Sequence, residues 1–236
     1  MKTKILVLIV LSLGLILPLQ AQQPNLKSLL GGKKNVKLPA SYQFEWKYKV
    51  NITSKGNQKL DMTYLIKPNS NYFGVQMESK EAKQMDFMCI VADMNLNSFT
   101  MFMESAGRKM AMPQGIPRDF GKKAKEPNYT YKEIGTKEIL GYKCFGMQIE
   151  DESYIATVYY TIEAPISFKQ LFHYSKDAAP KGFDPALIEV MKDEALVMEM
   201  NAEHKKKKKE SFTFKAVSLN EEAISINTKE YNSLGF

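Results

Sequence analysis

The most constraining feature of the sequence is a strict alternation of apolar and polar side chains over residues 44–52. Successive side chains of a strand point to opposite faces of a sheet, so only an extended backbone puts all the apolar ones on one side. The segment is therefore predicted to be a strand with one apolar and one polar face. Its apolar positions are Phe44, Trp46, Tyr48, Val50 and Ile52.

Much of the remaining sequence repeats this pattern, as short apolar or alternating runs separated by turn residues. Residues 60–67 form a predicted hairpin with the first strand, and further strands are expected over residues 72–112. A basic stretch with three prolines, residues 113–127, is predicted to be a long loop. Strands then resume over residues 129–161 and 196–228. We expect roughly ten strands in one large antiparallel sheet.

A helical period occurs only late in the sequence. Pro165 suits the first position of a helix, and Phe168, Leu171 and Phe172 follow at helical spacing. Asp184, followed by Pro185, has the features of a second helix start. The predicted fold class is α+β and mainly β, with a large curved antiparallel sheet that closes around about two short helices.

The first residues have the features of a secretory signal peptide. Lys2 and Lys4 precede an apolar run over residues 5–17, and Ala21 provides a small residue for cleavage. We predict a signal peptide over residues 1–21, a flexible leader over 22–40 and a single domain over 41–236. Without a cysteine at the cleavage point or a later apolar span, the mature chain is expected to be periplasmic or extracellular, without a lipid anchor or transmembrane helix.

One part of the chain resembles a known family. The residues that carry the resemblance are Ile139, Leu140, Gly141, Tyr142, Lys143 and Cys144, followed by Val158, Tyr159, Tyr160, Thr161 and Pro165. They resemble the secreted bacterial family called domain of unknown function 4412. Residues 182–188 are similar to the related family named for a Gly-Leu-Pro-Gly-Leu-Ile motif, which is the second alternative.

The first resemblance implies a fold similar to the lipoprotein carriers LolA and LolB. In that fold an open half-barrel has its concave face closed by helices. The resemblance implies no enzymatic activity.

The sequence contains none of the common catalytic motifs that we sought. These are the Gly-x-Ser-x-Gly, His-Glu-x-x-His and Cys-x-x-Cys motifs and the glycine-rich phosphate loop. The two histidines, His173 and His204, are expected to be packing or surface residues. We therefore expect no enzyme, no cofactor and no metal among the predicted site residues. The formal charge of +7 includes two lysines of the predicted signal peptide. Nucleic acid is therefore not an expected partner for an exported protein with so small a positive excess.

The two cysteines leave two alternatives open. In an oxidising compartment, Cys89 and Cys144 can form one disulfide that closes a long loop, which would contribute about 4 kcal/mol to stability. Otherwise both remain buried thiols.

Methionine is unusually frequent, with 14 in the chain. Three Met-x-Met pairs occur, at Met101/Met103, Met110/Met112 and Met198/Met200. Filling of an irregular core is the simplest interpretation. The function that we favour adds a cavity in which the curved sheet holds a lipid or another apolar ligand. The predicted ligand-binding residues are Trp46, Tyr48, Met62, Tyr64, Phe99, Met101, Met103, Met198 and Met200.

Two other functions stay open. Thioether sulfurs are soft ligands, so the Met-x-Met pairs could bind Cu(I). Alternatively, the protein is a structural or interaction module without a small ligand. In that case a run of lysines at a predicted hairpin tip would contact an anionic membrane or an acidic partner, or would simply keep the tip solvated. The run consists of Lys205, Lys206, Lys207, Lys208 and Lys209.

Overall fold

The computed structural model describes residues 36–54, 59–78, 86–115, 130–167 and 195–233. Within these ranges the chain is almost entirely β, and 12 strands form one sheet. The strands are β1 Ser41–Ser54, β2 Lys59–Ile66, β3 Tyr72–Glu78, β4 Phe87–Asp93, β5 Ser98–Ser105, β6 Arg108–Gly115, β7 Thr130–Ile139, β8 Tyr142–Glu150, β9 Tyr154–Thr161, β10 Leu196–His204, β11 Phe212–Asn227 and β12 Asn232–Ser233. Two short 3-10 turns are also present, η2 Lys208–Glu210 and η3 Thr228–Glu230.

The predicted signal peptide and most of the predicted leader lie outside the described residues. The same holds for both predicted helices beyond Ser167. In the described part of the chain, no helix has the length and apolar character needed to span a membrane.

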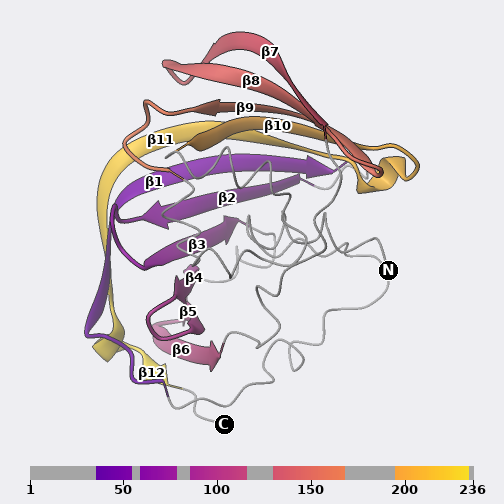
Figure 1. Ribbon diagram of the computed structural model, residues 1–236. Helices are drawn as coiled ribbons and strands as arrows, with labels where there is room; N and C mark the ends of the chain where they lie inside the picture. The colour runs from indigo at the N-terminus through magenta and orange to yellow at the C-terminus, as the bar shows by residue number, and fades with distance from the viewer. Residues whose placement is uncertain (1–35, 55–58, 79–85, 116–129, 168–194, 234–236) are drawn as a thin grey trace.

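The sheet consists of two meanders that meet at its centre. Strands β1 to β6 are sequential neighbours on one side, and β7 to β11 are sequential neighbours on the other. They join where β1 pairs with β11, so the first strand and the last long strand lie side by side (Figure 1). These pairs are antiparallel, and β12 adds to the edge of β6 in parallel. A mainly β fold with one curved open sheet is therefore confirmed.

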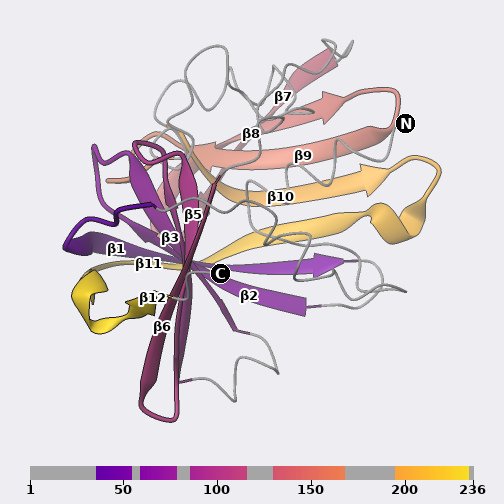
Figure 2. The same ribbon diagram turned by 90° about the horizontal axis from the view of Figure 1, so that it is seen from below.

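The sheet is strongly twisted and curved. Seen from below, β8, β9 and β10 run across the view, whereas β6 runs nearly perpendicular to them (Figure 2). Such a rotation is the accumulated twist of neighbouring strands. The sheet therefore has a concave inner face and a convex outer face (Figure 1).

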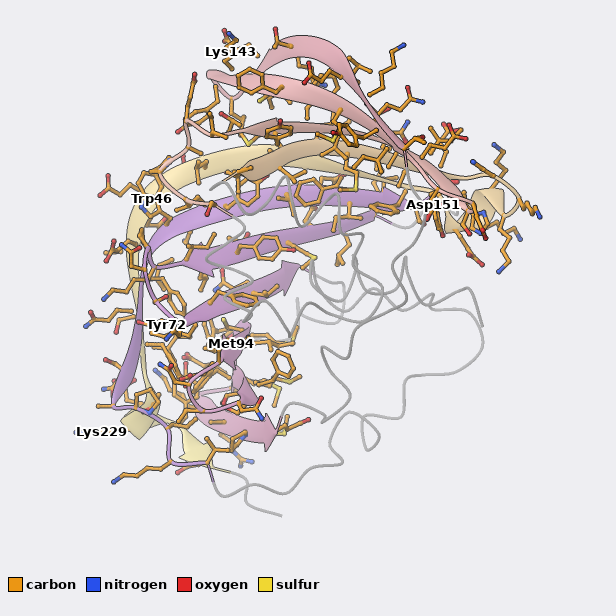
Figure 3. All side chains as sticks on the ribbon, viewed as in Figure 1. Trp46, Tyr72, Met94, Lys143, Asp151 and Lys229 are labelled. Atoms are coloured by element: carbon orange, nitrogen blue, oxygen red, sulfur yellow. The ribbon has the colours of Figure 1, made fainter. Side chains whose placement is uncertain are left out.

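The central strands β1 and β11 are long and bent. They have 14 and 16 residues. Phe44 pairs with Ile224 but Trp46 pairs with Glu221, so β11 carries an extra residue there. Such a bulge bends the strand that contains it. Beyond the bend, the two strands descend together along the outer face of β3 to β6, and Tyr72 lies between these layers (Figure 3).

Because of this bend, the alternating face of β1 contributes to two hydrophobic clusters. Tyr48, Val50 and Ile52 lie in the inner cluster, on the concave face of the sheet. Tyr42 and Phe44 lie in the outer cluster, packed on the opposite face of β2 to β6. The predicted strand is confirmed, but its apolar face is shared between two cores. The remaining buried members of the outer cluster are Leu65, Cys89, Val91, Phe102, Ala111 and Ile226.

Residues 230–233 pack across the edge of β6. Tyr231 donates a short hydrogen bond from its hydroxyl to Glu104, and its ring lies 5.0 Å from the Phe102 ring, centroid to centroid. Lys109 Nζ lies 2.7 Å from Glu230 Oε2 and 3.4 Å from Glu104 Oε1. Together with the short pairing of β12, these contacts cover part of an edge that would otherwise be open to association.

The predicted loop over residues 113–127 is wrong at its start. Strand β6 continues through Pro113, which lies opposite Thr100 of β5. Strand β12 pairs only with Met110 and Ala111. Pro113 thus occupies an outer-edge position, where a missing N–H is tolerated. The rest of the predicted loop, residues 116–127, lies outside the described residues.

Candidate functional site on the inner face

A row of side chains crosses the inner face from β1 to β6. Strand register places Tyr48, Tyr64, Val75, Ile90, Met101 and Met112 next to one another in that order. Exposure rises along the row: Tyr48 and Tyr64 are 0% exposed and Val75 is 9% exposed. The last three side chains are only half-buried. The inner face therefore changes from a closed core at β1 to an accessible apolar surface at β6.

The closed end is a packed aromatic and methionine core. The Tyr48 hydroxyl donates a hydrogen bond of 2.6 Å to the Val197 carbonyl oxygen and lies 3.9 Å from Met198 Sδ. The ring centroid of Tyr48 is 6.2 Å from that of Tyr64 and 6.4 Å from that of Phe214. Burial raises the pKa of both Tyr48 and Tyr64 well above the ordinary value. Neutral, hydrogen-bonded side chains of this kind hold β1 and β10 together.

The accessible end is dominated by methionine. Met103 lies opposite both Met88 on β4 and Met110 on β6, and Met101 lies opposite Met112. Directly paired residues share a face, so these thioether side chains form one patch across β4, β5 and β6. All of them are half-buried. We call this patch the methionine shelf, and it consists of Met88, Met101, Met103, Met110 and Met112.

The opposite face of the same strands is closed. Cys89, Val91, Phe102 and Ala111 alternate with the shelf residues and are at most 1% exposed. They are covered by the descending arms of β1 and β11 and by Tyr231, all of which belong to or pack on the outer cluster. Only one side of β4 to β6 thus presents apolar side chains that are partly accessible.

A small polar group lies within the outer layer. The Asp93 carboxylate is buried and accepts hydrogen bonds from the Tyr42 hydroxyl, at 3.0 Å, and from the Leu96 N–H, at 3.1 Å. Burial, together with this carboxylate, raises the pKa of Tyr42. The hydroxyls of Ser98 and Thr100 on β5 are also buried, and neither has a hydrogen-bond partner in the structure.

The predicted ligand-binding residues separate into two groups. Tyr48, Met62, Tyr64, Met198 and Met200 are fully buried members of the inner cluster, and Trp46 packs against it. Phe99, Met101 and Met103 lie instead on β5 and are half-buried. The nine residues therefore share the inner face, but only those on β5 and Trp46 are partly accessible.

Sequence reasoning left Met88, Met110 and Met112 out of the predicted site. The Met110/Met112 pair was visible in the sequence, but its position opposite Met101 and Met103 follows from strand register. Met88 lies in a run that is apolar at both parities, so its face could not be assigned. A hairpin register drawn from the tight turn at Ala106 and Gly107 would have revealed the cross-strand pairs.

The lysine run connects β10 to β11, and all five lysines are exposed. Three of them are paired with carboxylates: Lys205 with Glu150 at 2.6 Å, Lys207 with Glu210 at 2.8 Å and Lys208 with Glu203 at 3.9 Å. Asp151 lies at the same end of the molecule (Figure 3), and its carbonyl oxygen accepts a hydrogen bond from Lys205 Nζ. The tip is thus a mixed-charge surface, and its contact with an anionic membrane stays a prediction.

The two cysteines are free and buried in different places. Cys89 belongs to the outer cluster and Cys144 to the inner cluster. The disulfide alternative is therefore wrong for this fold, because the bent arms of β1 and β11 give each thiol a separate core. Burial raises the pKa of Cys89 to about 12 and also raises that of Cys144, which makes both thiols poor nucleophiles.

His204 has a structural role in the lysine hairpin. Its Nδ1 accepts hydrogen bonds from the backbone N–H groups of Lys206, at 3.2 Å, and Lys207, at 3.3 Å. Its ring packs on Tyr154 at a centroid distance of 4.6 Å. His173 lies outside the described residues. Among the residues that the structure describes, no three His, Cys, Asp or Glu side chains are grouped so as to hold a metal ion.

Comparison with known proteins gives a family match and several distant structural likenesses. The family described as "Domain of unknown function (DUF4412)" matches residues 44–222. No curated protein matches the sequence.

Among solved structures, the chain is similar to PNGF-II, at 14% identity and a TM-score of 0.38 over 80% of this chain and 30% of that chain. This chain therefore spans about 30% of the length of PNGF-II. An uncharacterized conserved protein from Thermus thermophilus gives 8% identity and a TM-score of 0.38, over 79% of this chain and 83% of that one. A LolA superfamily protein from Nitrosomonas europaea gives 8% identity and 0.29, over 83% and 93%. With TM-scores this low, these likenesses carry no argument about function.

Proposed function

This chain belongs to the family described as domain of unknown function 4412, and we propose that it holds an apolar molecule, such as a lipid acyl chain, against the methionine shelf. In this proposal the protein is a non-enzymatic binding protein of an exported compartment. The predicted signal peptide supports this location. The absence of catalytic motifs from the sequence supports a binding role.

One observation carries the proposal, namely the gradient of exposure across the inner face. At Tyr48 and Tyr64 the apolar row is fully buried, whereas at Met101 and Met112 it is half-buried. The far side of the same strands is sealed by the outer cluster. A patch of apolar side chains that is accessible from one side only is a typical feature of a binding surface.

The chemistry of the shelf suits a flexible apolar chain. Methionine is unbranched, has three rotatable bonds and carries a polarizable sulfur, so several methionines side by side can adapt to ligands of different shape. Ile90 and Phe99 extend the apolar surface along the same face. Each methylene group that such a ligand buries contributes about 0.8 kcal/mol, which corresponds to roughly a fourfold gain in affinity.

The proposal is tested by titrating the mature protein with saturated fatty acids of increasing length, detected by displacement of a fluorescent fatty-acid probe. The dissociation constant is expected to fall by up to about fourfold per added methylene until the chain exceeds the shelf. An affinity that does not change with chain length, or no displacement at any length, would contradict the proposal and favour the interaction module without a small ligand.

A pair of matched variants locates the site. Met101→Gln together with Met112→Gln keeps the side-chain length but places polar amides on the shelf, and we expect about a tenfold loss of affinity. Met147→Gln is the control, because Met147 is also half-buried and packs against the inner cluster, but lies on β8. An equal loss in both variants would show that the ligand does not bind at the shelf.

A further inference from the structure

Two of the three Met-x-Met pairs face each other across neighbouring strands. Met101 is directly opposite Met112, and Met103 is directly opposite Met110. Opposite residues have Cβ atoms about 5 Å apart, and residues two apart along a strand are separated by roughly 7 Å. The four Cβ atoms thus form the corners of a small rectangle on the inner face.

Four thioether sulfurs can meet above the centre of this rectangle. Each sulfur lies two bonds beyond its Cβ, on a side chain with three rotatable bonds. Met88 lies opposite Met103 on the other side and offers a further sulfur at the rim. All of these side chains are half-buried, so their sulfur atoms are not locked inside a packed core.

We infer that the methionine shelf is a binding site for the soft monovalent ion Cu(I), held by the sulfurs of Met101, Met103, Met110 and Met112. Uncharged thioethers select Cu(I) over hard cations, which prefer carboxylate, carbonyl and water oxygens. In the described strands the other cross-strand neighbours of these four methionines are Ile90, Met88 and Asn232. None of these neighbours is a carboxylate of the kind that Ca²⁺ or Mg²⁺ prefers.

The third Met-x-Met pair, Met198/Met200, differs from the other two in its burial and in its cross-strand neighbours. Met198 and Met200 are 0% and 2% exposed, and the inner-face neighbours of Met200 across the strands are Phe214 and Val158. Among the strand partners that the register gives, no methionine faces this pair. We therefore assign the Cu(I) site to the four facing methionines on β5 and β6 and not to a single Met-x-Met pair.

This inference does not rest on the proposed binding of an apolar molecule, and one set of variants separates the two. Leucine keeps the apolar volume of methionine but has no sulfur, and exchanges between them are well tolerated. We therefore consider a quadruple variant with Met101→Leu, Met103→Leu, Met110→Leu and Met112→Leu. The control is Met94→Leu with Met147→Leu, because both are half-buried methionines outside the shelf.

The experiment is an anaerobic titration of the mature protein with Cu(I) against a chromogenic Cu(I) chelator. The wild-type protein and the control are expected to compete for one equivalent, and the quadruple variant to lose at least 100-fold in affinity. X-ray absorption of the loaded wild-type protein is expected to show only sulfur around the metal. Displacement of the fatty-acid probe is expected to be unchanged in the quadruple variant, with circular dichroism confirming that it is folded.

The inference would be overturned if the wild-type protein failed to compete with the chelator. It would also be overturned if the folded quadruple variant bound Cu(I) as tightly as the wild type. The second result would place the metal at a site outside these four methionines. Either result leaves the fatty-acid titration to decide the proposed function by itself.

Discussion

Replacement of Gly74 by alanine tests whether the bent arm of β1 closes the outer face of the sheet. A Cβ atom at this position would lie 3.1 Å from Cys89 Sγ, 3.1 Å from Leu65 Cβ and 3.2 Å from Phe44 Cζ. Cys89 and Leu65 belong to the neighbouring strands β4 and β2, whereas Phe44 comes from the arm of β1. The added methyl group would therefore be enclosed by both layers at once.

Two opposing effects set the expected magnitude. Glycine within a strand is less favourable than alanine by about 0.5–1 kcal/mol, so in open space the substitution would stabilise the protein. Overpacking of a close-packed core costs about 1–3 kcal/mol. Contacts of 3.1 Å on two sides make overpacking the larger effect. We expect the free energy of unfolding to fall by roughly 0.5–2 kcal/mol.

Urea denaturation followed by fluorescence measures this change, because Trp46 is the only tryptophan in the chain and lies at the bend. In a double-mutant cycle, Cys89→Ala removes the Sγ atom that a new methyl group would meet. The cost of Gly74→Ala is then expected to shrink by about 1 kcal/mol. A Gly74→Ala protein more stable than the wild type, or an unchanged cost in the double mutant, would refute the two-layer packing.

Three further predictions concern buried groups. Tyr48→Phe is expected to lower the free energy of unfolding by about 1–3 kcal/mol, because the Val197 carbonyl loses its 2.6 Å hydrogen bond; urea denaturation measures this, with the exposed Tyr131→Phe as an unaffected control. Burial raises the pKa of Cys89 from 9.0 to about 12, so its stabilising contribution is complete below pH 9 and is lost as the pH rises towards 12. Urea denaturation at pH 8 to 10 should show that the Cys89 thiol contributes a loss of up to about 1.4 kcal/mol per pH unit, so the loss is smaller in Cys89→Ala than in the wild type. Thr100→Val removes a buried hydroxyl without a hydrogen-bond partner and is expected to raise the free energy of unfolding by about 1 kcal/mol, measured by urea denaturation. A loss of stability would instead reveal a partner such as a bound water.

The strands themselves were predictable because alternation is a local property of the sequence. Residues 44–52 do form one continuous strand, as their pattern indicates. The bend was not predictable, because the extra residue of β11 lies near Glu222 and Ala223, without a glycine or proline to mark it. The assignment of Phe44 and Tyr48 to different cores depends on this bend, and therefore on contacts between distant parts of the chain.

For the candidate site, the sequence predicted which residues share one face of the sheet, but not which of them are accessible. Parity along each strand placed Tyr48, Tyr64 and Met101 on one side of a sheet, and strand register confirms that they lie in one row. Their different exposure depends on the layers packed around each strand. The alternation of side chains along a strand carries no information about those layers. For this reason Met198 and Met200 were predicted to bind ligand although they are part of the closed core.

The central pairing of β1 with β11 also determines when the protein can fold. Ser54 pairs with Phe212, and Ser41 pairs with Asn227, so nearly the whole chain must be synthesised before β1 gains its second neighbour. At about 5–20 residues per second, a ribosome needs roughly 10–45 s to reach that point. Neither core is complete earlier, since β11 supplies Phe214 to the inner cluster and Ile226 to the outer one. Folding therefore waits for the last long strand, and closing so long a loop makes the reaction slow.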